Sequence, residues 1–324
     1  MMKRLCACVG TAALAAMVWV TAAPVAGQAG FTAPRTPWGD PDIQGSFTNN
    51  DENGIPLERP DDVSATRLED VSAAELARLR EEREEQRVER APLLGVLPGS
   101  NPVHWFEHFG AENSRAWLLV DPPDGKVPPM TAEAQARPRT RGGSSFGNGP
   151  FETVHDFSLY DRCISRGVPG SMMPGIYGNA YEIVQAPGYV TVMYEMIHEA
   201  RVIPLDGRPT VPSSIRSYMG DARGRWDGNT LVVETTNFKD GAAYRGANAE
   251  SLRLVERFTP VSADTLEWAV TIEDPTTWTR PWTFAMNLTR GGDEVQPFEY
   301  ACHEGNYGVP NMLSAARTEE QDAR

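Results

Sequence analysis

The sequence predicts a mainly β protein, in which an antiparallel meander forms a barrel or a strongly curled sheet behind an N-terminal arm and one charged helix. From Tyr181 onward, eight segments with strand-like patterning follow one another. Short turns rich in Gly, Pro, Asn and Asp separate most of them, and no helical pattern intervenes to carry a parallel crossover. Closure into a barrel removes exposed strand edges, so it is the most economical arrangement, with an open curled sheet or a sandwich as the alternative.

The expected strands follow one another with little sequence between them. They are YEIVQ, YVTVMYEMIHEARVIPL, SIRSYMG, GRWDGNTLVVETTNF, LRLVERFTPV, DTLEWAVTIED, WTRPWTFAMNLTR and FEYACHEG. We expect the barrel-like domain to occupy residues 101–308, with residues 309–324 as a C-terminal tail.

Residues 30–100 are expected to form the arm and the charged helix. The arm is rich in Pro, Gly, Asp and Asn, with one strand-like piece at 43–48, and we expect it to dock on the barrel. Ser72, followed three residues later by Glu75, is a capping box that opens the helix. The charges of this helix favour a solvated element packed along one edge, and a partner-binding helix is the alternative.

Residues 1–29 have the features of an export signal peptide. Lys3 and Arg4 precede an apolar run from Val9 to Ala23, and small residues suited to cleavage follow it. An uncleaved membrane anchor is the alternative. We therefore expect an exported protein, periplasmic or extracellular, whose mature chain starts between Gly27 and Gly30.

The charge of the mature chain argues against two classes of partner. Cleavage removes two of the 30 basic residues and none of the 44 acidic ones, so the net charge is 28 − 44 = −16. Such a field opposes contact with nucleic acid and, after signal cleavage, with anionic membranes. A small-molecule ligand is the partner that we expect, and the sequence leaves the oligomeric state open.

Two cysteines remain after the signal is removed. Cys163 and Cys302 would lie in a compartment that favours disulfides, so we expect a bond between them. Two buried free thiols are the alternative.

The segment 274–286 places a charge on an apolar face. If it is a strand, Trp278, Arg280 and Trp282 point to one side, because strand side chains alternate with period two. By the same parity Glu256 shares the apolar face of Leu254 and Phe258. Arg280 and Glu256 are therefore both predicted inside, either as a structural ion pair or with Arg280 binding an anion between aromatic walls.

The histidines are weaker candidates. His198 shares parity with Val192, Met196 and Val202 if no bulge intervenes, so it is expected to face inward, either as a satisfied core residue or as a catalytic acid or base with Glu256. Tyr300 and His303, at the end of the last expected strand, are candidate ligand contacts at the barrel mouth.

No established catalytic motif is present. The chain has neither the GxSxG elbow of serine hydrolases nor a phosphate-binding glycine loop with its lysine. His104 and His108 have a spacing of four, but the flanking sequence lacks the HExxH acid. We therefore expect no metal and no organic cofactor.

Eight short stretches resemble a large group of exported bacterial proteins to which no function is assigned. They are GDPDIQG, VDPPDGKVPP, RCISRGVPG, EMIHEARVIPLDGRP, GDARGRWDGNTLVVETTNF, VERFT, EDPTTWTRPW and YACHEGNYG. The resemblance covers most of the mature chain and implies no mechanism. The run of strands is also similar to that of lipocalins, which implies a barrel and no particular ligand.

Three functions remain open at this stage. The first is the binding of a small apolar or aromatic anion in a pocket lined by Trp278, Arg280 and Trp282. The second is a lyase or hydrolase without an organic cofactor that uses the same pocket. The third is a structural or interaction protein whose barrel is filled.

Overall fold

The computed structural model describes residues 31–94, 112–137, 151–175, 177–241, 244–292 and 295–322. The expected signal peptide and the pair His104 and His108 lie outside these ranges. The described strands are β1 Gly45–Thr48, β2 Leu119–Asp121, β3 Ala180–Ala186, β4 Tyr189–Tyr194, β5 Ala200–Pro204, β6 Asp221–Asp227, β7 Thr230–Thr236, β8 Arg253–Pro260, β9 Thr265–Glu273 and β10 Trp282–Arg290. The helices are α1 Ala73–Leu94, α2 Ala132–Ala136 and α3 Gly308–Asp322.

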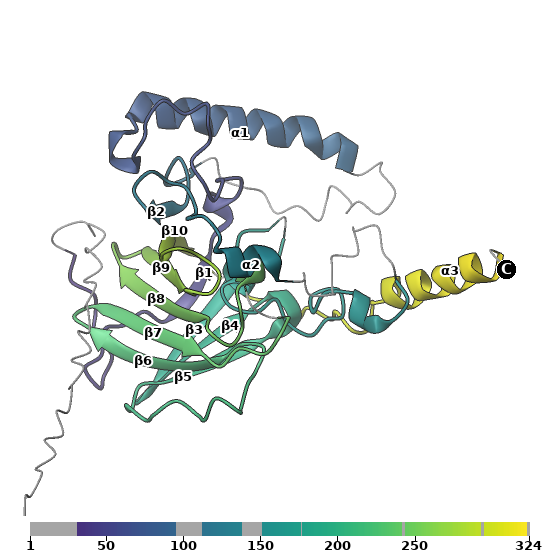
Figure 1. Ribbon diagram of the computed structural model, residues 1–324. Helices are drawn as coiled ribbons and strands as arrows, with labels where there is room; N and C mark the ends of the chain where they lie inside the picture. The colour runs from purple at the N-terminus through teal and green to yellow at the C-terminus, as the bar shows by residue number, and fades with distance from the viewer. Residues whose placement is uncertain are drawn as a thin grey trace, which may run out of the picture.

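The strands form one sheet that curls into a nearly closed barrel (Figure 1). Around the barrel the order is β5-β4-β3-β1-β10-β9-β8-β7-β6, and β2 pairs with β10 outside this path. Every pairing along the path is antiparallel. The prediction of an antiparallel meander that forms a barrel is therefore confirmed.

The two ends of the path, β5 and β6, run in the same direction. Eight antiparallel steps separate them along the path, and an even number of reversals restores the starting direction. Parallel neighbours cannot be joined by a tight turn, so the chain between them must return along the length of the barrel. Residues 205–220, which we call the strap, make this return and pass below β5 and β6 in Figure 1.

Side chains, rather than a hydrogen-bonded ladder, bring β5 and β6 together at what we call the seam. Gly224 of β6 lies so close to the end of β5 that a Cβ there would come within 2.8 Å of Ile203 in β5 and 2.5 Å of Leu205, the first residue of the strap. Ala222, the other small inward residue of β6, is also buried. Small residues on β6 thus make room for the large side chains of β5.

Polar groups at the start of β6 hold the strap in place. The carboxylate of Asp221 accepts from the Val211 amide at 2.8 Å and from Arg223 at 2.6 Å. Arg223 also donates to the Pro209 carbonyl, and Asn237 donates to the Val211 carbonyl. The GDARGRWDG stretch therefore anchors the strap as well as forming part of a hairpin.

Aromatic and aliphatic side chains fill the barrel. Trp268, Phe258 and Phe284 are fully buried. Trp268 packs against both Phe258 and Phe284, and Trp282 packs beside Phe284. Residues from every strand of the path belong to this core. Ile203 is the contribution of β5, and Ala222 that of β6.

One ion pair crosses this interior. Arg201 of β5 donates to both carboxylate oxygens of Glu256 on β8, at 2.6 and 3.0 Å, and Trp268 donates to the same carboxylate at 3.2 Å. The two charged side chains are 3% and 0% exposed. Burial alone would lower the pKa of Arg201, but the attraction of the Glu256 carboxylate outweighs this effect, and the pKa is raised. Glu256 is inside as predicted, but its partner is Arg201 and not Arg280.

The arm and α1 pack against the barrel. Ile43 and Phe47 of the arm and Leu79 of α1 belong to the same core as the barrel strands. The predicted start of the helix is confirmed, since the Ser72 hydroxyl accepts from the Glu75 amide at 3.1 Å. Arg80 ties α1 to the Asn113 carbonyl at 2.9 Å. The strand-like piece of the arm is β1, which joins the barrel between β3 and β10.

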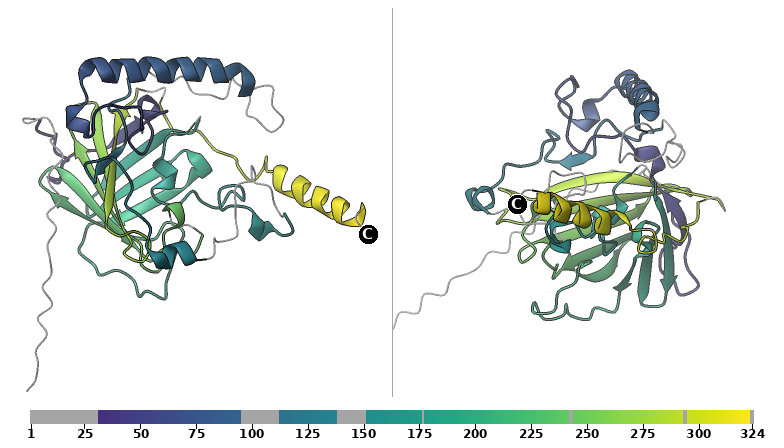
Figure 2. Two further views of the ribbon diagram at one scale, coloured as in Figure 1. Left: turned by 45° about the horizontal axis from the view of Figure 1, so that its top comes forward. Right: turned by 90° about the vertical axis from the view of Figure 1, so that its right-hand side faces the viewer.

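The chain ends in a helix that projects from the body. α3 occupies most of the expected tail, contains no buried residue, and extends away from the barrel in Figure 1 and in the left view of Figure 2. Arg317 donates from it to the Glu152 carbonyl at 2.8 Å. Among the described residues, no helix has both the length and the apolar character needed to cross a membrane.

We expect the Arg201–Glu256 pair to show strong coupling in stability. Arg201→Met alone should lower the free energy of unfolding by about 3 to 5 kcal/mol, because it leaves a buried carboxylate unpaired. The double variant Arg201→Met, Glu256→Gln should recover most of this loss, because neither charge then remains. Denaturant unfolding of both variants measures the coupling, and additive losses would contradict it.

Candidate functional site

The predicted site around Arg280 does not form. Arg280 lies before β10, its side chain is 51% exposed, and it pairs with Asp121 at 2.9 Å. The prediction that it faces the barrel interior is therefore wrong. Trp278 and Trp282 are buried and pack edge to face at 5.4 Å between ring centroids. They are part of the core, and neither lines the two depressions described below.

A turn, rather than a continuous strand, explains the position of Arg280. The carboxylate of Asp274 accepts from the Thr276 amide and hydroxyl and from the Ser251 hydroxyl, and the Thr277 and Trp278 amides donate to its carbonyl. This is the local hydrogen bonding that draws Asp out of a strand and into a turn. Pro281 has no amide hydrogen, so the ladder resumes only at Trp282.

His198 is not inside the barrel either. The expected long strand is broken at Met196–His198, where Ile197 and His198 both have positive φ, and the chain reverses into β5. His198 is exposed, and the inward residues of β5 are Arg201 and Ile203, whereas Val202 is 57% exposed. With Glu256 fully buried against Arg201 and His198 exposed, the two proposed catalytic residues share no solvent-accessible site.

The last expected strand is also absent. Residues 295–301 have no strand structure, Phe298 is 70% exposed, and His303 is exposed in a turn. Tyr300 is half-buried and stacks on Tyr177 with 6.3 Å between ring centroids. His303 and Tyr300 therefore do not point into a barrel mouth as members of a strand.

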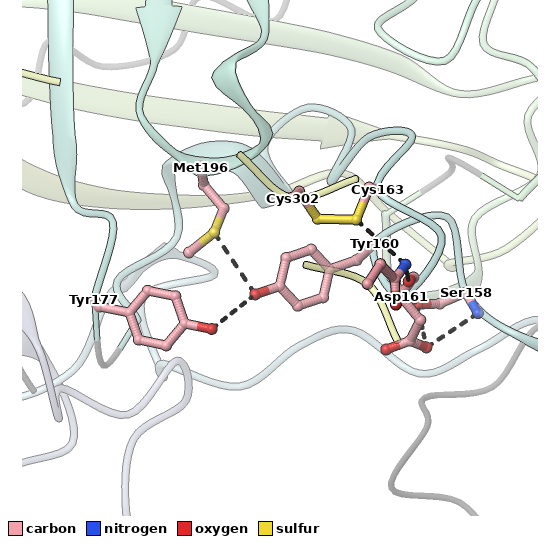
Figure 3. Close-up of a disulfide and its surroundings, with 8 residues drawn as sticks. Ser158, Tyr160, Asp161, Cys163, Tyr177, Met196 and Cys302 are labelled. Atoms are coloured by element: carbon pink, nitrogen blue, oxygen red, sulfur yellow. Dashed lines mark hydrogen bonds between the residues drawn. A yellow bond between two sulfur atoms is a disulfide. The ribbon is translucent and has the colours of Figure 1, made fainter. Parts of the chain in front are cut away.

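A disulfide holds this C-terminal segment in place. Cys163 and Cys302 are bonded, with 5.7 Å between their Cα atoms, which confirms the predicted pairing (Figure 3). Asn306 adds a hydrogen bond to the Asp161 carbonyl at 2.7 Å. The bond connects residues 139 positions apart, so it ties the end of the chain to the segment before β3.

Tyrosine hydroxyls gather beside the disulfide. The Tyr160 hydroxyl lies 3.4 Å from that of Tyr177 and 3.6 Å from the sulfur of Met196 (Figure 3). Burial and the bond with Tyr177 raise the pKa of Tyr160 to about 12, and burial together with both neighbouring phenols raises the pKa of Tyr300. Tyr160 and Tyr300 therefore stay protonated near neutral pH, so their hydroxyls can donate hydrogen bonds but cannot act as phenolate bases.

A depression of about 310 Å³ lies at the barrel end where β8 leads into β9, under the N-terminal arm. We call it the arm pocket. Its volume is at the small end of the range for ligand pockets. Seven of its twelve lining residues are apolar: Phe31, Pro34, Ile43, Phe47, Pro260, Ala263 and Leu266.

Arg290, the last residue of β10, supplies a cation to the arm pocket. Its guanidinium lies 4.7 Å from the ring centroid of Phe47 and donates to the carbonyls of Gln44 and Ala263. Within the part of the chain that the structure describes, no carboxylate forms an ion pair with it. Gly45 permits this arrangement, because a Cβ there would collide with the guanidinium.

The same parity that misplaced Arg280 could have found Arg290. The inward stripe of β10 runs through Trp282, Phe284, Met286 and Leu288, and two residues further it reaches Arg290. The predicted inward set ended at Leu288 and so did not include Arg290. Nothing in the sequence indicated that Arg201 faces inward. Its position depends on the turn before β5, and that turn contains no Gly, Pro, Asn or Asp.

Histidine, cysteine and acidic side chains do not gather into a metal site in the described ranges, where no group of three or more could hold an ion. The chemistry that the arm pocket offers is therefore that of a guanidinium beside apolar and aromatic surface. Such a guanidinium suits a carboxylate or another oxyanion attached to an apolar body.

Comparison with known proteins adds only distant likenesses. No protein-family model and no curated protein matches the sequence. Among solved structures, a secretory abundant heat soluble protein from Ramazzottius varieornatus is 13% identical, with 41% of this chain and 87% of that chain covered and a TM-score of 0.25. A mutant of the fluorescent protein UnaG is 15% identical over 41% of this chain and 86% of that chain, with a TM-score of 0.23.

Likenesses this weak say nothing about what this chain binds. They also leave the resemblance to exported bacterial proteins as a prediction.

The turn at Asp274 gives a pH-dependent prediction. Burial alone would raise the pKa of Asp274, but hydrogen bonds from Ser251 and Thr277 lower it below its ordinary value of 3.8. A lowered pKa stabilises the fold above pH 3.8, and this contribution is lost as pH falls through the folded-state pKa. Asp274→Asn should therefore cost about 2 kcal/mol at pH 7 and progressively less below pH 4. Denaturant unfolding at a series of pH values tests this, and a cost independent of pH would contradict it.

Proposed function

We propose that the protein is exported and binds a small apolar or aromatic anion in the arm pocket, with Arg290 binding the anionic group. The observation that carries the proposal is the guanidinium of Arg290, which lies against Phe47 in a largely apolar depression and donates only to main-chain carbonyls among the described residues. A buried or half-buried guanidinium ordinarily has a carboxylate partner. Arg290 has none among the described residues, so its charge remains available to a ligand.

The lining supports an apolar body for the ligand. Phe47 and Leu266 form part of the wall, and burial of an apolar group against them gains roughly 25 cal/mol per Å². A volume of about 310 Å³ suits a molecule of the size of benzoate or octanoate. Asp42 also lies in the lining, but its carboxylate accepts two hydrogen bonds from Gln44.

A structural or interaction role is the second candidate, and the filled barrel favours it. Trp268, Trp282 and Phe284 are fully buried where a hollow barrel would hold its ligand. In that case the arm pocket would have no specific ligand. The binding experiment below separates the two candidates.

Calorimetry with paired ligands tests the role of Arg290. We expect benzoate and octanoate to bind more tightly than benzyl alcohol and octanol by about 1.5 to 3 kcal/mol, the contribution of a charged hydrogen bond. Arg290→Met should remove this difference and leave the binding of the alcohols unchanged.

Arg257→Met is the matched control. Arg257 is on the outer face of β8 and pairs with Asp227 at 2.9 Å, and neither residue lines the arm pocket. Its loss should leave the binding of both ligand classes unaltered. Equal affinity for acids and alcohols in the unaltered protein, or the same effect from both substitutions, would refute the proposal and favour the structural role.

A further inference from the structure

The arm pocket contains a carboxylate as well as the guanidinium of Arg290. Asp42 lines the pocket, and its Oδ1 accepts from the backbone amide of Gln44 at 3.1 Å and from the Gln44 side chain at 3.2 Å. Within the described ranges, Oδ2 of Asp42 accepts no hydrogen bond and Asp42 forms no ion pair. Nη2 of Arg290 likewise donates to no described residue, because the hydrogen bonds of this side chain come from Nε and Nη1. Both charged side chains therefore keep one polar atom for a ligand.

A second depression differs from the arm pocket in this respect. It measures about 460 Å³ and lies between the strap and β5. Four charged residues line it, and each of them forms an ion pair with a carboxylate or a guanidinium of the protein: Arg201, Arg208, Asp221 and Arg223. Its charges are therefore matched within the protein, whereas those of the arm pocket are left for a ligand.

Gln44 fixes how far apart the two charged groups of the arm pocket are. Its amide donates to Oδ1 of Asp42, and its carbonyl accepts from Nη1 of Arg290 at 2.5 Å. Because the nitrogen and the carbonyl oxygen of one residue are at most about 3.7 Å apart, Oδ1 and Nη1 lie within about 9 Å of each other. The two side chains are thus close enough to bind one small molecule together, although they form no ion pair with each other.

An α-amino acid has charged groups at a matching separation. Its ammonium nitrogen and a carboxylate oxygen are about 3 to 3.6 Å apart, and a hydrogen bond of about 2.8 Å at each end gives a span of about 6 to 9 Å between the protein atoms that bind it. A free amino acid can therefore donate from its ammonium group to Asp42 while its carboxylate accepts from Arg290.

The ammonium group also removes an unfavourable interaction. A simple anion bound to Arg290 would be repelled by the carboxylate of Asp42, because like charges that share a site oppose each other. An ammonium group on the same ligand is attracted to that carboxylate instead. Both charges of the pocket then have a partner of opposite sign.

The rest of the lining selects the side chain of such a ligand. Ile43, Phe47 and Leu266 are buried apolar residues of the wall, and Asp42 and Arg290 are the only charged residues among the twelve that line the pocket. A charged ligand side chain would find no further partner there. A volume of about 310 Å³ suits the size of phenylalanine or leucine.

We propose that the ligand of the arm pocket is an apolar or aromatic α-amino acid, whose carboxylate binds Arg290 and whose ammonium group binds Asp42. This inference rests on the proposed function, in which Arg290 binds the anionic group, and it adds the second polar contact and the class of ligand.

Calorimetry on the full-length protein with L-phenylalanine, 3-phenylpropanoate and phenethylamine tests this assignment. The three molecules share one aromatic body, but the second lacks the ammonium group and the third lacks the carboxylate. We expect L-phenylalanine to bind about tenfold or more tightly than either of the others, because each of them loses a charged hydrogen bond. Asp42→Asn should remove the advantage over 3-phenylpropanoate and leave the binding of 3-phenylpropanoate unchanged or tighter. Asparagine keeps the acceptor for Gln44, and binding of 3-phenylpropanoate reports that the pocket is folded.

Asp264→Asn is the matched control. It removes the same charge from the exposed turn between Ala263 and Thr265, which both line the arm pocket, but Asp264 itself does not line it. The affinity for all three molecules should stay as it is in the unaltered protein. Equal losses of L-phenylalanine affinity in the two variants would overturn the inference, since they would show a general effect of charge.

Failure of this inference and failure of the proposed function give different results. If Arg290→Met weakens 3-phenylpropanoate but L-phenylalanine binds no more tightly than 3-phenylpropanoate, the contact with Asp42 is refuted and the anion site remains. If none of the three molecules binds, if phenethylamine binds as tightly as L-phenylalanine, or if Arg290→Met has no effect on 3-phenylpropanoate, the proposed function is refuted and this inference with it.

Discussion

The number of strands in the barrel is the constraint on which the rest of the structure depends. Nine strands alternate direction around the path, so the first and last neighbours, β5 and β6, must be parallel. A tight turn cannot join them, and the strap has to return along the barrel instead. The anchoring of the strap by Asp221 and Arg223, and the small residues Ala222 and Gly224 that let β5 approach, all follow from this one requirement.

The ion pair between Arg201 and Glu256 is the second consequence of the seam. It connects β5, at the seam, to β8 on another part of the wall, through an interior otherwise filled by aromatic side chains. A buried pair of this kind adds little net stability but strongly disfavours arrangements in which either charge is left alone. It can therefore fix the position of β5 where backbone hydrogen bonds do not.

Period-two patterning predicted much of the barrel but could not place every charge on it. It correctly put Glu256 and Trp282 inside, since both lie in regular strands with clear alternation. It failed at Arg280 because Asp274 and Pro281 impose a turn, and both residues were visible in the sequence as turn formers. It failed at His198 for a different reason. That turn uses positive φ at Ile197 and His198, which glycine or asparagine would normally supply, so nothing in the sequence marked it.

Long-range pairing was beyond sequence reasoning altogether. Arg201, the partner of Glu256, belongs to β5, whose inner face was predicted wrongly because the turn at Met196–His198 was missed. The arm strand β1 completes the barrel wall through contacts between segments distant in the sequence. The disulfide was predictable only because two cysteines remained once the predicted export signal was set aside. Its position at one end of the barrel, beside Tyr160 and Tyr177, required the structure.

Amide hydrogen exchange measured by NMR tests the parallel seam most directly. β5 is hydrogen bonded only to β4, and β6 only to β7. In each of these two strands every second amide points away from its one partner strand and should exchange quickly, while the other amides are protected. Central strands such as β8 and β9 should be protected at every amide. Protection of all non-proline amides in β5 and β6 would contradict the account, because it would require a continuous ladder between the two strands.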